Sequence, residues 1–257
     1  MISSTSNAKV KNIMNLKKSA KARKKEKCFL VEGPRMFFEI PKDRIEECYL
    51  TEEFEDKYAE ELKGWHYELI SENVCKHLSD TKTPQGVIAV VRRTEPSIEE
   101  LLHKEKNPCF FLLENLQDPG NLGTIVRTAE GAGVTGIIMN RETVDIYNPK
   151  TIRSTMGALY RMPFVYVEDL RETIHTLKEK NIKSYAAHLD GKNTYDKEDY
   201  RQGTAFLIGN EGNGLREEIA QCADTWIRIP MCGQVESLNA AVAATVLMFE
   251  VSRQRRG

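Results

Sequence analysis

Short, continuously apolar runs alternate with amphipathic stretches through the second half of the chain. Continuous runs are typical of strands that are buried on both faces of a parallel sheet. The stretches between them predict helices that cover both faces, so we expect an α/β fold. The predicted strands are Cys109–Leu113, Gly136–Met139, Phe164–Val167, Ser184–His188, Thr204–Ile208 and Thr225–Ile229. The predicted helices are Gly120–Gly131, Pro149–Leu159, Leu170–Lys180, Arg216–Gln221 and Ser237–Arg253.

The first half predicts a smaller α/β unit with shorter elements. Asn7 can cap a helix whose apolar residues Val10, Ile13 and Met14 follow the helical spacing. The stretch 94–107 contains a proline and precedes another, which is typical of a linker. We therefore expect domains at 1–93 and 108–257, joined by that linker. The predicted strands are Cys28–Val31, Ile45–Leu50, His66–Ile70 and Gly86–Arg92, and the predicted helices begin at Gly33-Pro34 and span Glu53–Lys63 and Glu72–Leu78.

Composition places the chain among ordinary globular proteins, because 40% of its 257 residues are apolar and 29% are charged. This excludes a disordered, collagenous or fibrous protein. The longest strongly apolar stretch, Ala240–Phe249, is much shorter than the ~20 residues that a membrane span needs. No apolar signal core follows Met1, so we expect a cytoplasmic protein with no membrane segment.

The cysteines and histidines form no CxxC or HExxH motif and show no metal-ligand spacing. We therefore predict no metal site. A chain of this length can bury a core without disulfides, so we expect reduced thiols. The cysteines are Cys28, Cys48, Cys75, Cys109, Cys222 and Cys232, and the histidines are His66, His77, His103, His175 and His188.

The formal net charge of -1 conceals a strongly uneven distribution. Residues 31–60 carry ten acids against four cations, whereas nine cations and one acid, Glu26, lie between positions 9 and 27. Such a basic arm could bind phosphates with release of counterions, or it could be a solvated helix that aids solubility. The cations of the arm are Lys9, Lys11, Lys17, Lys18, Lys21, Arg23, Lys24, Lys25 and Lys27.

One glycine motif is misleading, because Gly131–Gly136 matches the G-x-G-x-x-G fingerprint of dinucleotide-binding proteins. That fingerprint lies between a strand and a following helix, so that phosphate meets the helix N-terminus. Here a predicted helix precedes the glycines and a predicted strand follows them. We therefore expect these glycines to end the helix and turn the chain.

Two other segments combine turns with polar side chains after predicted strands. In 118–127, a Pro-Gly turn leads into a helix with Asn121 near its start and Arg127 about two turns later. A helix start offers free amide donors to an anion, although a capped helix with a surface arginine explains the segment equally well. In 209–214, three glycines surround Glu211, which indicates either a tight corner or a shaped pocket.

A third segment, 229–244, starts where a predicted strand ends at a proline. After a short loop, Ser237 can cap a helix that has alanines at 240, 241, 243 and 244. Small residues permit another backbone to approach closely, either in the core or at a subunit contact. Core packing accounts for the alanines but leaves the loop unexplained.

Together these segments resemble the three signature motifs of the SpoU (TrmH) family of RNA ribose 2′-O-methyltransferases, in the SPOUT superfamily. Asn121–Arg127 is similar to motif one, Gly209–Gly214 to motif two and Ile229–Ala243 to motif three, in matching order and spacing. Asn148–Ala158 resembles the segment between motifs one and two. The first half more loosely resembles the ribosomal-protein-like RNA-binding domain of one branch of the family.

The resemblance covers about Pro108–Arg256 and implies a fold, a cofactor and an assembly. The family fold is a parallel α/β sheet with a deep trefoil knot, which no periodicity could predict. S-adenosylmethionine lies in the knot, and family members are homodimers whose Ala-rich last helix would contribute to the interface. The implied cofactor-binding residues are Gly209, Ile229 and Leu238, with Leu207, Ile208, Met231 and Ser237 adjacent.

The implied reaction is in-line attack of a ribose 2′-hydroxyl on the sulfonium methyl group. By family analogy Arg127 activates the hydroxyl. Free arginine is a poor base because its pKa exceeds ~12, so we expect Arg127 to orient the nucleotide and stabilise the developing alkoxide. The implied neighbours of Arg127 are Asn121, Glu211, Ser237 and Asn239.

An RNA substrate gives the basic arm a function, since its cations, together with Arg153, would contact phosphates around the target. The two-domain layout favours ribosomal RNA of the 23S type over transfer RNA. A knotted enzyme that methylates a base is a further alternative. A protein without turnover, such as an RNA-binding or ribosome-assembly factor, is a different class, and binding of S-adenosylmethionine would discriminate it from an enzyme.

Overall fold

The computed structural model describes residues 1–102 and 105–256 and divides into two compact units. The first comprises Met1–Thr94 and Asp145–Tyr160, and the second comprises Glu95–Val144 and Arg161–Gly257. The segment 145–160 therefore packs with the N-terminal residues, although the sequence places it inside the predicted second domain. Two contacts explain this packing: Asp145 pairs with Arg23 at 2.8 Å, and the ring of Tyr147 lies 4.6 Å from that of Phe29.

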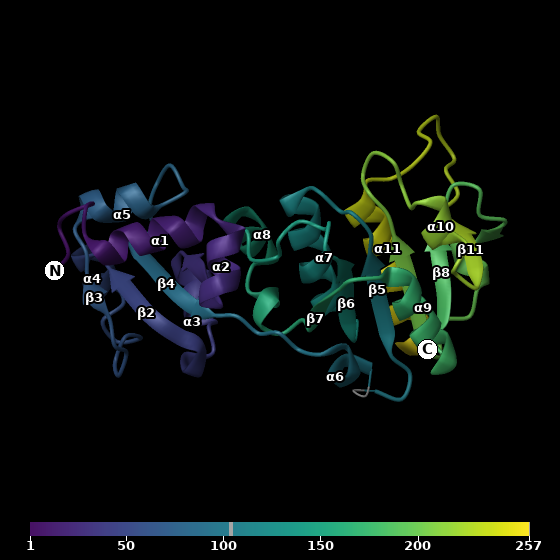
Figure 1. The fold of residues 1–257 in the computed structure, drawn as a ribbon, viewed down its shortest axis with the longest axis horizontal. Coiled ribbons are helices and arrows are strands. Elements are labelled where there is room, and N and C mark those ends of the chain that lie inside the picture. Colours follow the sequence, from purple (N-terminus) through teal and green to yellow (C-terminus); the bar gives the residue numbers. More distant parts are fainter. Residues whose placement is uncertain (103–104, 257) are drawn as a thin grey trace. The chain divides into compact units, whose positions relative to one another are not determined.

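The second unit is built on a seven-stranded sheet in the order β7-β6-β5-β10-β8-β11-β9 (Figure 1). Every neighbouring pair is parallel, which confirms the predicted parallel α/β sheet. The short edge strand β9 was not predicted. The strands are β5 (Cys109–Leu113), β6 (Gly136–Asn140), β7 (Phe164–Val167), β8 (Lys183–Ala187), β9 (Asn193–Thr194), β10 (Thr204–Ile208) and β11 (Thr225–Arg228).

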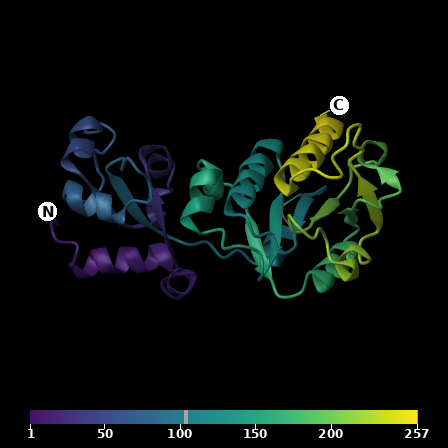
Figure 2. The ribbon, with the colours of Figure 1, turned by 90° about the horizontal axis from the view of Figure 1, so that it is seen from above.

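Helices cover both faces of this sheet. In Figure 2, α7 and α11 lie together on one face, and α9 lies on the other. On the α9 face, Leu112 and Leu207 of the strands pack with Ile174 and Ile219 of the helices. The helices are α6 (Ile98–Leu102), α7 (Pro119–Ala132), α9 (Leu170–Glu179), α10 (Glu217–Ala220) and α11 (Ala240–Arg256), with the 3₁₀ turn Tyr195–Lys197.

The two ends of α7 follow from its sequence. The side chain of Asp118 caps the helix by accepting a hydrogen bond from the backbone N of Asn121 at 2.8 Å, and Pro119 occupies the first turn. At the other end Gly133 adopts φ 76°, a left-handed conformation that glycine accepts without strain. The interpretation of these glycines as a helix end is confirmed.

The last helix, α11, begins at Ala240 rather than at the predicted Ser237. The Oδ1 atom of Asn239 accepts hydrogen bonds from the backbone N of Ala241 at 2.9 Å and of Val242 at 3.3 Å. Asn239 is therefore the cap, and the prediction of a Ser237 cap was wrong. Both residue types suit the position, so sequence alone could not choose between them.

The first unit contains a four-stranded sheet in the order β1-β4-β2-β3. β4 is antiparallel to β1 and β2, whereas β3 is parallel to β2. Asn7 caps the first helix, as predicted, but the acidic helix is shorter than expected. The strands are β1 (Cys28–Glu32), β2 (Ile45–Leu50), β3 (Glu68–Leu69) and β4 (Val87–Arg92). The helices are α1 (Ala8–Lys18), α2 (Ala20–Glu26), α3 (Pro34–Phe38), α4 (Glu52–Lys57), α5 (Glu72–Leu78) and α8 (Pro149–Thr155), with 3₁₀ turns Lys42–Arg44 and Ala158–Tyr160.

Candidate active site at the carboxyl edge of the parallel sheet

The three segments singled out in the sequence follow β5, β10 and β11, whose carboxyl ends share one edge of the sheet. Leu113 and Ile208 pair at the ends of the neighbouring strands β5 and β10, so the first two loops leave the sheet side by side. β11 lies three positions from β5, yet the loop after it, which rises above the sheet in Figure 1, returns to the start of α7. All three loops therefore meet.

Glu211 joins the loop after β10 to the loop after β5. Its carboxylate accepts hydrogen bonds from the backbone N of Gln117 at 3.1 Å and of Asp118 at 2.9 Å, and from Nδ2 of Asn121 at 3.0 Å. Burial raises the pKa of Glu211, but these three hydrogen bonds outweigh it and hold the pKa below its usual value. At neutral pH the carboxylate is ionised and serves as an acceptor that orders the start of α7.

Asn239 joins the loop after β11 to the loop after β5. Its Nδ2 donates to Oδ1 of Asn121 at 3.0 Å, while its Oδ1 caps α11. Asn121 thus accepts from Asn239 and donates to Glu211, so one amide side chain bridges the other two loops. These contacts bring three predicted site residues together at the N-termini of two helices, where the helix dipoles favour negative charge.

The loop after β10 is a tight turn that requires glycine. Asn210 and Gly214 exchange backbone hydrogen bonds of 3.0 and 2.9 Å, and Gly214 adopts φ 67°. A Cβ atom on Gly209 would lie 2.1 Å from the carbonyl carbon of Gly214, so no larger residue fits there. The glycines therefore bring two stretches of backbone into contact beside exposed Glu211.

The loop after β11 exposes its backbone. Residues 232–237 are exposed, and with the described residues the backbone from Met231 to Leu238 makes no hydrogen bond. Its N–H and C=O groups are thus open to a ligand, which fits a cofactor that is held largely by backbone groups. Val235, 62% exposed, adds an apolar contact surface in the same loop.

The other residues predicted for the catalytic and cofactor sites differ in how deeply they are buried. Arg127 lies exposed on α7 and forms no hydrogen bond or ion pair with any residue that the structure describes. Ile229 and Met231 are half-buried after β11. Leu207 and Ile208 are buried strand residues at 1% and 3% exposure, and Leu207 packs in the core below α9. Its side chain therefore packs in the core, and the placement of Leu207 beside a cofactor site stays a prediction.

Four polar residues at this edge were missed in the sequence. Glu114 binds Arg216, and Asn210 donates from Nδ2 to the carbonyl O of Asn115 at 2.8 Å. Asn115 stands at φ 53°, a left-handed conformation that asparagine tolerates. One sequence signal could have identified Glu114 and Asn115, because an acid and an amide directly follow the apolar strand 109–113. In parallel sheets, the loops that follow the carboxyl ends of strands commonly bind ligands.

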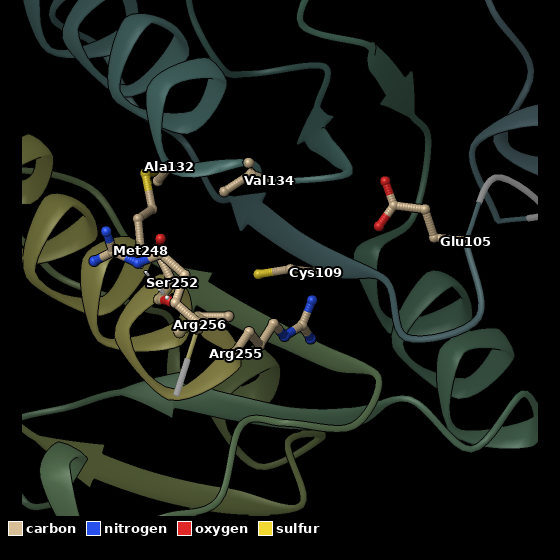
Figure 3. Close-up of a pocket in the computed structure, with 10 residues that line it drawn as sticks. Glu105, Cys109, Ala132, Val134, Met248, Ser252, Arg255 and Arg256 are labelled. Carbon is tan, nitrogen blue, oxygen red and sulfur yellow. Dashed lines mark hydrogen bonds between the residues drawn. The ribbon is translucent and has the colours of Figure 1, made fainter.

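A cavity of about 280 Å³ lies at the opposite end of the second unit (Figure 3). Cys109 at the start of β5, Val134 after α7, and Met248 and Arg255 near the end of α11 line it. Burial raises the pKa of the Cys109 thiol to about 12, so it is no nucleophile at neutral pH. None of the predicted site residues lines this cavity, so it is separate from the candidate site at the carboxyl edge of the sheet.

The basic arm of the first unit forms α1 and α2, and two of its cations are structural. Arg23 is 3% exposed; its guanidinium binds Asp145 and the carbonyl O atoms of Leu16 and Lys17. Lys17 donates to the carbonyl O atoms of Leu78 and Ser79 at 2.8 Å. These bonds occupy both side chains, so the structure argues against the prediction that they contact RNA.

The other predicted RNA contacts are more accessible. Lys9 pairs with Glu68, and Arg153 is partly exposed beside Asp80 at 3.4 Å. Most lysines of α1, α2 and the residue that follows α2 are exposed to solvent. The exposed lysines beyond Lys9 are Lys11, Lys18, Lys21, Lys24, Lys25 and Lys27.

Residues 1–102 and 105–256 contain neither a membrane-spanning helix nor a cluster of metal ligands. No helix among them is long and apolar enough to cross a membrane. No group of three or more His, Cys, Asp or Glu side chains in residues 1–102 and 105–256 could hold a metal ion.

Comparison with protein families matches both halves of the chain. A model of the SpoU rRNA Methylase family matches residues 108–249. A model of the MRM3-like substrate binding domain matches residues 7–89.

Similar proteins and structures cover from two thirds to nearly all of the chain. The 23S rRNA (guanosine(2553)-2'-O)-methyltransferase RlmP of Bacillus subtilis is 32% identical over 97% of this chain and 98% of its own. The 23S rRNA (guanosine-2'-O-)-methyltransferase RlmB of Bordetella pertussis is 36% identical over 67% of this chain and 72% of its own. The crystal structure of the SpoU methyltransferase AviRb from Streptomyces viridochromogenes, in complex with AdoMet, superposes with a TM-score of 0.88 and 28% identity, covering 98% of this chain and 99% of that one.

Proposed function

Because this chain belongs to the SpoU rRNA methylase family, we propose that it transfers a methyl group from S-adenosylmethionine to a ribose 2′-hydroxyl of 23S-type ribosomal RNA. RlmP, which carries this activity in its name, matches 97% of this chain, and the model of a substrate binding domain matches residues 7–89 of the first domain. The observation that carries the proposal is the hydrogen-bonded set Asn121, Glu211 and Asn239, since it joins the three loops into one centre.

The cofactor would be held by the loops after β10 and β11. AviRb binds AdoMet, and the open backbone of residues 231–238 offers donors and acceptors to such a ligand. The proposed contacts are Gly209, Ile229, Met231, Ser237 and Leu238, with Ile208 contributing backbone only. The return of the chain from β11 to α7 fits the deep trefoil knot of the SPOUT superfamily, which we include in the proposal.

S-adenosylmethionine supplies an electrophilic methyl group on its sulfonium sulfur. The protein must then position the ribose hydroxyl in line with that methyl and stabilise the alkoxide charge that develops. Arg127 has a guanidinium that no described side chain engages, so it is available to the target nucleotide. Asn121, Glu211 and Asn239 hold the start of the helix that carries Arg127, and Ser237 lies in the adjoining loop.

Residues 1–93 would bind the RNA substrate, with 94–107 as the linker and 108–257 as the catalytic domain. The match to a substrate binding domain at residues 7–89 supports the first assignment. Exposed lysines of α1 and α2, together with Arg153 of α8, would contact phosphates and supply affinity without base selectivity. The packing of 145–160 with the first unit adds α8 to this domain.

We include a homodimer and a cytoplasmic location in the proposal. Val242 and Phe249, seven residues apart on α11, are 47% and 48% exposed, and such an apolar stripe suits a second copy of the helix. A ribosomal RNA substrate places the reaction where ribosomes assemble, which is the cytoplasm.

The test is to incubate the protein with S-adenosylmethionine and 23S ribosomal RNA from cells that lack it, and then to identify the methylated nucleosides by mass spectrometry. The proposal predicts one 2′-O-methylnucleoside that the RNA lacks before incubation. A base-methylated product would favour a knotted enzyme that methylates a base. Methylation of transfer RNA alone would show that transfer RNA, not ribosomal RNA, is the substrate. Binding of RNA without binding of S-adenosylmethionine would favour a ribosome-assembly factor.

A further inference from the structure

Glu114 is a buried carboxylate that the proposed reaction does not use. It directly follows β5, and its side chain is 1% exposed. Its Oε1 accepts a hydrogen bond from Nε of Arg216 at 2.5 Å, and its Oε2 accepts one from the backbone N of the same residue at 2.9 Å. A charge so deeply buried needs hydrogen-bonded partners, because its desolvation is otherwise uncompensated. Glu114 and Arg216 are thus fixed to each other.

The same residue holds both ends of the loop after β10. The backbone N of Glu114 donates to the carbonyl O of Ile208 at 2.9 Å, immediately before Gly209. Arg216, held by the Glu114 carboxylate, immediately follows Leu215 at the other end. One residue therefore sets the separation of the two ends of the Gly209–Leu215 loop.

The second carboxylate near Arg216 cannot replace Glu114. Nη1 of Arg216 lies 2.9 Å from the carboxylate of Glu218, whose side chain is 55% exposed. An exposed ion pair contributes little and leaves its partners mobile. Burial distinguishes the two acids, so the position of Arg216 depends on Glu114.

We propose that Glu114 is a positioning residue that acts through Arg216 to hold the Gly209–Leu215 loop in the shape that binds S-adenosylmethionine. The inference rests on the proposed function, since it takes this loop as part of the cofactor site. It predicts a defect in cofactor affinity and none in RNA affinity, because no part of the pair lies in the RNA-binding domain.

The informative substitution is Glu114→Gln, which preserves shape but places an NH₂ group against one of the two Arg216 donors. We expect the Kd for S-adenosylmethionine, measured by calorimetry on the full chain, to rise about tenfold. Arg216→Ala, which keeps the backbone donor, should raise Kd by about threefold, and Arg216→Lys should restore part of that loss. Combining Glu114→Gln with Arg216→Ala should add little, since both remove one interaction.

The matched control is Arg201→Ala. Arg201 forms an exposed pair with Asp199 at 2.8 Å and precedes β10 at the other end of the strand. The Arg201→Ala variant should bind S-adenosylmethionine with the affinity of the wild type. In methyl-transfer assays on 23S ribosomal RNA, Glu114→Gln should raise the KM for S-adenosylmethionine and leave the KM for RNA unchanged, a split that general loss of structure would not produce.

The outcomes separate the inference from the proposed function. Wild-type affinity in both Glu114→Gln and Arg216→Ala would overturn the inference and leave the proposed function standing. A wild-type protein that binds no S-adenosylmethionine would overturn both. If thermal unfolding shows that Glu114→Gln is unfolded at the assay temperature, the half-exposed Arg216 variants decide, and unchanged affinity in Arg216→Ala then overturns the inference.

Discussion

Gly209 and Glu211 lie two residues apart in one loop, yet the structure constrains them in different ways. Gly209 is fixed by space, because the backbone of Gly214 occupies the volume of a side chain. Glu211 is fixed by charge and hydrogen bonds, because three donors from the first loop converge on its carboxylate. The sequence predicted both as site residues, but neither reason could be read from it, since each depends on a partner that only the fold brings near.

The steric constraint gives a prediction with a control in the same loop. Gly209→Ala should abolish binding of S-adenosylmethionine in calorimetry, because the loop must shift to admit the methyl group. Gly212→Ala should bind normally, since a Cβ atom there meets only Oδ1 of Asn210 at 3.5 Å. Equal affinities in the two variants would contradict the packing of this loop.

The carboxylate gives a prediction about pH. The pKa of Glu211 is lower in the folded state than its ordinary value of 4.5, so its stabilisation is fully present above that value and is lost as the pH falls through the folded-state pKa. The wild type should therefore unfold at a higher temperature than Glu211→Gln at pH 7, and the difference should shrink below about pH 4.5. A difference that stays constant down to pH 3 would show that ionisation of Glu211 is irrelevant.

At the scale of elements, the strands were predicted best. Cys109–Leu113, Phe164–Val167 and Thr204–Ile208 have the predicted bounds because each continuous apolar run ends sharply at an acid or a glycine. The two-residue strand β9 carries no such run. The segment 145–160 joins the first unit through the distant pair of Arg23 and Asp145, which no local pattern encodes. The knot implied by the family likewise lies beyond any periodicity.

The start of α11 supplies a prediction at this scale. Asn239→Ala removes the helix cap and should destabilise the protein by ~1 kcal/mol, which lowers its unfolding temperature by about 2–4 °C. Ser237→Ala is the control, because Ser237 is exposed and caps nothing. Scanning calorimetry distinguishes them, and a larger effect for Ser237→Ala would show that the helix starts where the sequence first indicated.

At the scale of the whole molecule, the basic arm divides into cations that bind the protein and cations that face solvent. Charge counting treats all nine alike, whereas burial and hydrogen bonds remove Arg23 and Lys17 from the surface. The long-range asymmetry of charge was visible in the sequence. Which cations serve the fold was not, because their partners lie far along the chain.

The division predicts opposite effects for two sets of substitutions. Changing Lys21, Lys24 and Lys25 together to glutamine should leave the unfolding temperature unchanged and reduce the salt dependence of RNA binding by about two to three in log-log slope. Arg23→Gln should instead cost about 3 kcal/mol of stability, because it leaves Asp145 without its partner. Filter binding across a salt series measures the slope for the triple lysine variant. An unaltered slope would show that these lysines belong to a solvated helix and do not contact RNA.

The most direct measurement compares wild type with Arg127→Ala in two assays on the same preparations: calorimetric titration with S-adenosylmethionine, and transfer of its labelled methyl group to 23S ribosomal RNA. The loops after β10 and β11 should still hold the cofactor in the variant, so its Kd should match the wild type. Transfer to the ribose oxygen should be lost, because that oxygen loses the cation that orients it. Undiminished transfer by Arg127→Ala would contradict the account.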